Sequence, residues 1–273
     1  MTKPRFLVVS FLLITSTTRS HAEELVNVNC NADLVCVKVY KGRNVDIFLE
    51  NKTHKPLSFR LIFTTENLSH LNLKTHTLSQ PTTAKVVSFP TPNEPWGYEY
   101  RIHYGHESHK HDDEYLYTLP YGPGSTYLVT QSHANISTHH FGNLYAIDWA
   151  MPIGDPIHAA REGTVVSTYQ LAKVAGAEDG SGTANHIWIQ HSDGTIGKYL
   201  HLDHEGVYVR EGHRVGAGQL IGAAGNTGFS SGPHLHFSVS TLGGATLYQT
   251  INVRFNTRSG PSYLVDERRY SHP

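Results

Sequence analysis

The sequence is poor in cysteine, and its charges nearly cancel. Among 273 residues there are two cysteines, Cys30 and Cys36, and the formal net charge is −1 with the histidines neutral. No basic face stands out, so we expect no nucleic-acid partner. The two cysteines lack the second Cys or His pair that a structural zinc site needs. In an exported protein we therefore expect them to form one small disulfide loop.

Long apolar runs are also lacking, and the longest lies at the start of the chain. In MTKPRFLVVSFLLITSTTRSHA, a basic start precedes an apolar core from Phe6 to Ile14, which is too short to span a bilayer. Polar residues then lead to Ala22, an order typical of a secretory signal peptide. An uncleaved anchor is the alternative. We predict a signal peptide over residues 1–22 and an exported protein, periplasmic or secreted, whose mature chain has no membrane span.

Two nucleotide-binding motifs and one catalytic motif are missing from the sequence. No GxGxxG precedes a helical pattern and no glycine-rich loop ends in Lys-Ser/Thr, which argues against nucleotide binding. No HExxH motif is present, so no glutamate base comes with a helical pair of metal ligands. Histidine, in contrast, is abundant, and its 20 residues favour metal chemistry.

Short β-like segments separated by turn residues fill the chain, and nothing in the first half has helical periodicity. We predict an all-β protein with a small β-sandwich-like accessory domain at 23–119, a second β-rich domain at 120–252 and a polar tail at 253–273. The histidine-rich segment HYGHESHKHDDEY near their boundary has two interpretations. It captures metal loosely through His103, His106, His109 and His111, or it is a solvated hairpin end or linker, which we favour.

The stretch SSGPHLHF places His234 and His236 two positions apart after a Gly-Pro turn. In a β-strand both imidazoles project to one face and Leu235 to the other. An isolated pair of this kind is most simply the polar side of a half-solvated strand. A functional interpretation needs partners from elsewhere in the chain.

Suitable partners lie upstream of this pair. Asp148 stands between Ile147 and Trp149, where a carboxylate is costly to bury unless it is paired or holds a cation. The adjacent His139 and His140 precede it, and His201 ends the strand-like segment GKYLHL. One carboxylate and several imidazoles from distant segments are the ligand types of a catalytic zinc site, which leaves one position to water. A surface-facing Asp148 is the alternative.

Four linked motifs carry a resemblance to a known family: YAIDWAMPIGDPIHAAREGTVV, NHIWIQHSDGTIGKYLHL, VREGHRVGAGQLIGAAGNTG and SSGPHLHFSV. From about residue 127 to 240 the chain resembles the lysostaphin-like (LytM-type) zinc peptidases, which cut the peptide part of bacterial peptidoglycan. The resemblance implies an all-β peptidase domain with one zinc ion in a groove on a sheet. Asp155 stands where many relatives have threonine, a peripheral difference.

The resemblance also implies roles for individual residues. Asp148, His236 and either His139 or His140 are the implied zinc ligands, and the spacing to Asp148 leaves the choice between the two neighbours open, with His139 favoured. His201 and His234 are the implied catalytic histidines. Because no glutamate base accompanies the ligands, these two imidazoles must handle protons and help to stabilise the oxyanion. Histidine suits that task because its ordinary pKa is about 6.5.

We therefore predict an exported zinc endopeptidase that hydrolyses amide bonds in peptidoglycan peptides by metal-activated water. The accessory domain would position or regulate the enzyme, or bind the wall or a partner protein. Two alternatives stay open. One is a non-catalytic relative that activates another wall hydrolase, and the other is a secreted protease for glycine-rich proteins.

Overall fold

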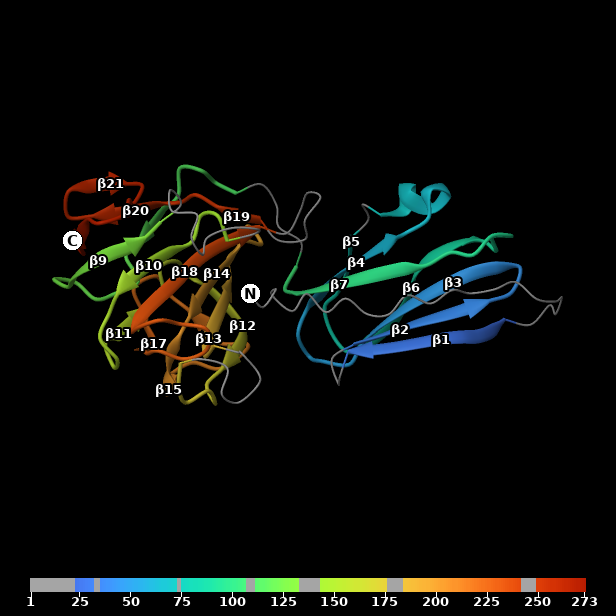
Figure 1. Cartoon of the computed structure of the whole chain (residues 1–273), viewed down its shortest axis with the longest axis horizontal. Coiled ribbons are helices and arrows are strands. Elements are labelled where there is room, and N and C mark those ends of the chain that lie inside the picture. The colour runs from blue at the N-terminus through green and yellow to red at the C-terminus, as the bar shows by residue number, and fades with distance from the viewer. Residues whose placement is uncertain are drawn as a thin grey trace. The chain divides into compact units, whose positions relative to one another are not determined.

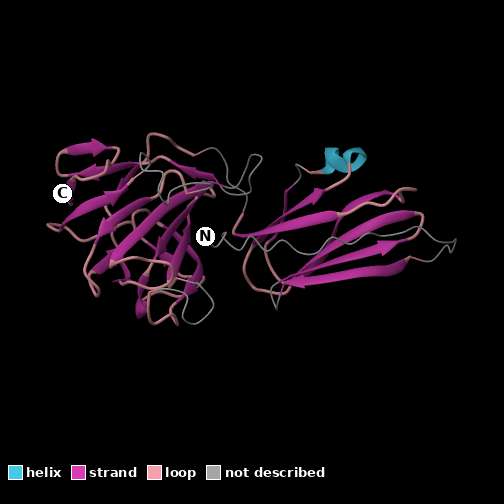
Figure 2. Cartoon of the chain, in the orientation of Figure 1, coloured by secondary structure: helices cyan, strands magenta, loops and turns pink. Residues whose placement is uncertain are grey.

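The computed structural model describes residues 23–31, 35–72, 75–106, 111–132, 143–175, 184–241 and 249–273. The chain forms two compact units, Met1–Glu107 and Ser108–Pro273. Strands dominate both units, and the helical element in the described residues is the short 3-10 helix η1 (Glu66–Leu71), so the predicted all-β class is confirmed (Figure 2). No helix among these residues has the length and apolar character that a membrane crossing requires.

Two antiparallel sheets that share one apolar core build the first unit. One sheet has the order β1-β2-β3-β6 and the other the order β5-β4-β7. Alternate residues of both sheets, such as Val37 and Ile47 in one and Phe59 and Tyr100 in the other, meet in a single buried cluster. The strands are β1 (Glu24–Asn31), β2 (Val35–Lys41), β3 (Asn44–Asn51), β4 (Leu57–Phe63), β5 (Thr75–Leu78), β6 (Thr82–Pro90) and β7 (Tyr98–Tyr104).

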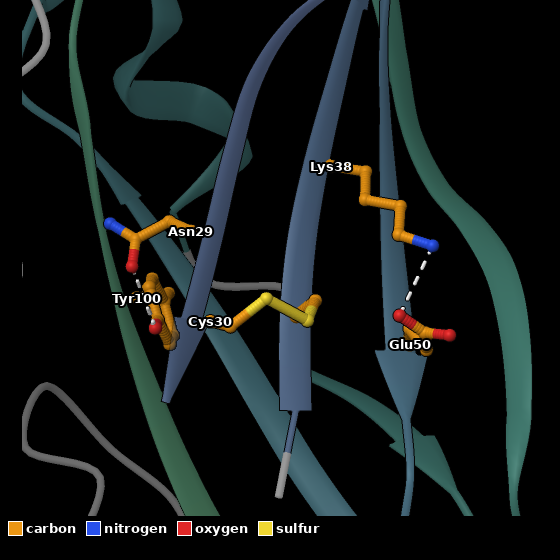
Figure 3. The surroundings of a disulfide bond; sticks show 6 residues. Asn29, Cys30, Lys38, Glu50 and Tyr100 are labelled. Carbon is orange, nitrogen blue, oxygen red and sulfur yellow. Dashed lines mark hydrogen bonds and ion pairs between the residues drawn. A yellow bond between two sulfur atoms is a disulfide. The ribbon is translucent and has the colours of Figure 1, made fainter. Parts of the chain in front are cut away.

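A disulfide joins β1 and β2 of this unit (Figure 3). Cys30 and Cys36 lie directly opposite each other in the antiparallel register and are bonded, as predicted from the sequence. The side chains of Lys38 and Glu50 form an ion pair across β2 and β3 nearby. The bond covalently closes the hairpin that begins the first unit.

The second unit is built on a nine-stranded sheet (Figure 1). Its order is β16-β12-β13-β14-β18-β10-β9-β22, with β19 also paired to β18. The sheet's strands are β9 (Thr126–Gln131), β10 (Ile147–Ala150), β12 (Gly163–Tyr169), β13 (His186–Gln190), β14 (Ile196–Leu200), β16 (Arg214–Val215), β18 (His234–Thr241), β19 (Gln249–Ile251) and β22 (Arg269–Ser271).

Two smaller sheets complete this unit, one with the order β11-β17-β15 and one with the order β21-β20-β8. Their strands are β8 (Leu116–Thr118), β11 (Pro156–His158), β15 (Leu202–Val207), β17 (Leu220–Ala224), β20 (Arg254–Thr257) and β21 (Gly260–Ser262). One face of the large sheet is apolar and packs in the core of the unit. Every second residue of its central strands points to this face, including Trp149, Tyr199, Leu235 and Phe237.

Residues 253–273, expected as a polar tail, form three strands of the second unit. β20 pairs with β8 and β22 pairs with β9. The Phe255 side chain is fully buried in the core of the unit. The strands have only three or four residues each, too few for an alternating pattern to be seen in the sequence.

A buried polar cluster beside the core fixes the turn between β13 and β14. Arg161 donates hydrogen bonds to Asp193 at 2.8 Å and to the Tyr117 hydroxyl at 3.1 Å. His191, 4% exposed, donates from Nδ1 to the Glu162 carbonyl oxygen at 2.8 Å. Burial lowers the pKa of His191 to about 4.

We expect the second unit to lose stability on acidification because of His191. The unfolded chain binds a proton there near pH 6.5, but the folded chain binds it only near pH 4, so a falling pH favours unfolding between those values. The expected loss is about 2–3 kcal/mol of unfolding free energy at pH 4.5. Urea unfolding at pH 7 and 4.5 measures it. His191→Gln should flatten the dependence, whereas the same change at the exposed His213 should not; equal slopes would contradict the assignment.

Candidate functional site

Strand β18 holds the histidine pair at the centre of the large sheet, between β14 and β10 (Figure 1). Its register with β10 sets Asp148 opposite His236 and Ala150 opposite His234. Leu235 is fully buried in the core on the other face. The predicted projection of both imidazoles to one face is therefore confirmed.

Asp148 and His236 form the centre of the site. Their side chains face each other across β10 and β18, with Nδ1 of His236 2.8 Å from Oδ1 of Asp148. Asp148 is 7% exposed and His236 8%. The backbone alternation that buries Ile147 and Trp149 on the core face turns the carboxylate to the opposite face. The buried carboxylate is thus paired, as its apolar sequence neighbours require.

His201 comes to the same place from the end of β14. Its ring centroid lies 4.5 Å from that of His234 and 5.9 Å from that of His236. Its backbone is in the left-handed region, with φ 64°, a conformation that costs a non-glycine residue free energy and is found preferentially at functional sites. Burial lowers the pKa of His201 to about 3, and the nearby His236 and His234 imidazoles act in the same direction.

Backbone carbonyls fix the orientation of two of these imidazoles. Nδ1 of His201 donates to the Thr227 carbonyl oxygen at 2.7 Å. Nδ1 of His234 donates to the Gly232 carbonyl oxygen at 2.8 Å and lies 3.1 Å from the Ser230 hydroxyl. Because a carbonyl only accepts, the proton of each neutral ring is on Nδ1. Nε2 of each ring is then an acceptor when the imidazole is neutral.

A network of hydrogen bonds that the sequence did not predict holds the backbone next to His201. Asn185 is fully buried and donates from Nδ2 to the carbonyl oxygens of Leu202 at 3.3 Å and Asp203 at 2.9 Å. The Thr227 hydroxyl donates to the Leu202 carbonyl oxygen at 2.7 Å and accepts from the Asn185 backbone N–H. These bonds hold Leu202 and Asp203, the two residues that follow the strained His201 backbone.

The network also requires a glycine at position 228. Its φ is 72°, and a Cβ there would lie 2.7 Å from the Ala184 backbone. Only glycine allows this close approach, which places Thr227 against Asn185. The motifs NHIWIQ and GNTG contain both polar residues, but their role depends on contacts between segments that are distant in the sequence.

The remaining predicted histidines do not join this group in the described residues. His139 and His140 lie outside the residues that the structure describes. His103 is buried in β7, whereas His111 contacts Asp113 and the Tyr117 hydroxyl in the second unit. Within the described ranges, no set of three or more His, Cys, Asp or Glu side chains meets the geometry of a metal site.

Comparison with known proteins locates a family domain over this site. Residues 142–247 match peptidase family M23. The chain is 40% identical over 96 residues to the peptidoglycan DD-endopeptidase ShyA of Vibrio cholerae, a match that covers 35% of this chain and 20% of ShyA. It is 40% identical over 101 residues to the glycyl-glycine endopeptidase ALE-1 of Staphylococcus capitis, covering 37% and 25%.

Other similar proteins include lysostaphin of Staphylococcus simulans, 35% identical over 133 residues that cover 48% of this chain and 23% of lysostaphin. The chain thus spans about a fifth to a quarter of the length of these relatives. Among solved structures, the catalytic domain of the M23 protein EnpA of Enterococcus faecalis is 26% identical, with 47% of this chain and 92% of that domain covered and a TM-score of 0.36.

The family match contains Asp148, His201, His234 and His236 and overlaps most of the part of the chain that the sequence motifs single out. The resemblance inferred from those motifs is confirmed. We conclude that the second unit contains a peptidase family M23 domain over residues 142–247.

Proposed function

We propose that the protein is an exported zinc endopeptidase that hydrolyses amide bonds in the peptides of bacterial peptidoglycan. The observation that carries the proposal is the convergence of a buried carboxylate and three imidazoles on one face of the sheet, centred on the 2.8 Å approach of Asp148 and His236. The names of the relatives, peptidoglycan DD-endopeptidases and a glycyl-glycine endopeptidase, support this substrate class.

The donor atoms present fit a zinc ion. A carboxylate oxygen and an imidazole nitrogen, both common zinc ligands, face each other from neighbouring strands. Asp148 and His236 would hold the ion together with His139 or His140, which completes the three protein ligands of a catalytic site. When bound, zinc supplies a Lewis acid that lowers the pKa of water and polarises a carbonyl group.

His201 and His234 would handle protons beside this ion. Their Nδ1 protons are held by the Thr227 and Gly232 carbonyl oxygens, so Nε2 of each ring is the atom left to face the substrate. A neutral Nε2 can accept a hydrogen bond from the attacking water and orient it. The protonated ring can donate to the oxyanion or to the leaving amine.

The disulfide supports the export part of the proposal. Bonds such as Cys30–Cys36 form and persist in oxidising compartments, which the secretory signal predicted at residues 1–22 would reach. The protein would then act in the periplasm or outside the cell, where its proposed substrate is found.

Digestion of purified cell walls tests the proposal. The whole chain, loaded with zinc, should release peptide fragments that mass spectrometry identifies by new amino and carboxyl ends at one type of amide bond. A chelator should stop the release, and added zinc should restore it. A folded, metal-free protein that leaves walls intact would instead favour an activator of another hydrolase. Cleavage of glycine-rich proteins in preference to walls would favour a secreted protease.

A further inference from the structure

A second set of side chains lies on the same face of the large sheet as His236, one pleat further along β18. The register between β14 and β18 sets Leu200 opposite His236 and Lys198 opposite Ser238. Because alternate residues share a face, His234, His236 and Ser238 follow each other in one line. Lys198 therefore lies on the side of His236 away from His234, about 7 Å along the strand.

The Lys198 side chain lies over the ring of Trp188, next to His186. Its ammonium nitrogen lies 4.9 Å from the ring centroid of Trp188, which is its register partner on β13. The Trp188 ring lies 5.1 Å from the His186 ring, measured between centroids. Nδ1 of His186 donates to the Ala184 carbonyl oxygen, so its Nε2 accepts a hydrogen bond from the Ser167 hydroxyl. These two bonds fix the orientation of the His186 imidazole beside Trp188.

The surroundings of Lys198 suit a polar, anionic group. Lys198 and Trp188 are half-buried, so the ammonium has lost part of its hydration without being closed off from solvent. Burial lowers the pKa of Lys198 to about 7. Ser238, which lies opposite Lys198, is 2% exposed and adds a buried hydroxyl group to this polar line.

We propose that Lys198 binds a free carboxylate of the substrate peptide, one to two residues from the amide bond that is cut, and so makes the site selective for acidic peptides. This proposal rests on the proposed function. The spacing agrees with a carboxylate about two residues from the scissile amide. An extended peptide advances about 3.3 Å per residue, and Lys198 is about 7 Å along the strand from His236. A carboxylate gains a charge-assisted hydrogen bond from a partly desolvated ammonium.

A sugar ring is the less favoured occupant. Stacking of a ring needs an open aromatic face, but the Lys198 ammonium lies over the Trp188 ring. The Trp188 ring is therefore covered by a positive charge on the side where Lys198 lies.

Two matched peptides test the role of Lys198. Both have the wall-peptide sequence on either side of the amide bond that is cut, with that bond intact, and they differ only in whether the carboxyl group nearest the scissile amide is free or amidated. The wild-type kcat/KM should favour the free carboxylate by about ten- to a hundredfold. Lys198→Met, which keeps an unbranched side chain of similar length, should bring this ratio close to one, and Lys198→Arg should largely preserve it. The exposed Lys173→Met is the matched control and should retain the wild-type ratio.

Binding measurements separate this proposal from the proposed function. Calorimetry in a His234→Gln background measures the affinity for the two peptides without hydrolysis. Carboxylate-dependent binding that Lys198→Met removes, together with a zinc-loaded wild-type protein that cuts neither peptide, would contradict the proposed function and support the role of Lys198. A wild-type ratio near one, or an equal loss on both peptides in Lys198→Met, would overturn that role. Affinity that depends on attached sugar and not on the carboxyl group would point to glycan binding instead.

Discussion

Asp148→Ala is expected to remove bound zinc and to lower kcat/KM for wall peptides by about a thousandfold or more. The change deletes both a proposed ligand and the negative charge that balances the ion, while His236 keeps its place on β18. Metal catalysis contributes several kcal/mol to the transition state, and each 1.36 kcal/mol is a factor of ten in rate. Atomic absorption of the dialysed protein measures the zinc, and peptide release measures the rate.

Controls distinguish loss of a ligand from loss of the fold. Asp148→Asn keeps the size of the side chain and removes only its charge, so it should fold like the wild type and bind zinc weakly. Asp112→Ala removes an exposed carboxylate in the same unit and should change neither quantity. An Asp148→Ala protein that keeps stoichiometric zinc would show that this carboxylate is not a ligand.

His201→Ala is expected to separate metal binding from turnover. Its ring lies beside His234 and His236, and its Nδ1 is held by the Thr227 carbonyl oxygen, so it can act on protons without holding the ion. General acid–base catalysis contributes about 10²- to 10⁴-fold, and kcat should fall by that amount. The zinc content should stay near one per chain, and KM should change little.

The left-handed backbone of His201 requires a second variant. Asparagine adopts this conformation more readily than alanine, so His201→Asn should lose turnover without extra strain. His213→Ala, at an exposed histidine of the same unit, is the matched control. Loss of zinc in both His201 variants, with an intact fold, would make His201 a ligand and would require a different assignment of roles.

The parts of the site that were predictable from sequence depend on local pattern. Alternation along HLHF is enough to place His234 and His236 on one face and Leu235 on the other. A carboxylate between Ile147 and Trp149 is enough to demand a partner. That His236 is this partner follows from the register of β10 with β18, which no local pattern contains.

Other features arise only from contacts between distant segments. In the sequence Asn185 looks like an ordinary turn residue, but its side chain donates hydrogen bonds to the carbonyl oxygens of Leu202 and Asp203. Lys198 reads as the polar side of a strand, yet it lies over Trp188. The first zinc ligand also stays a prediction, because His139 and His140 lie outside the described residues. Separate replacement of the two would decide between them.

Anomalous diffraction at the zinc edge, from crystals of the zinc-loaded whole chain, tests the central claim most directly. One strong peak should appear, bonded to both the Asp148 carboxylate and the His236 imidazole, with a third ligand from His139 or His140 and with His201 and His234 nearby but unbound. A zinc-loaded protein whose peak lies away from Asp148 and His236, or crystals with no peak at full activity, would contradict it.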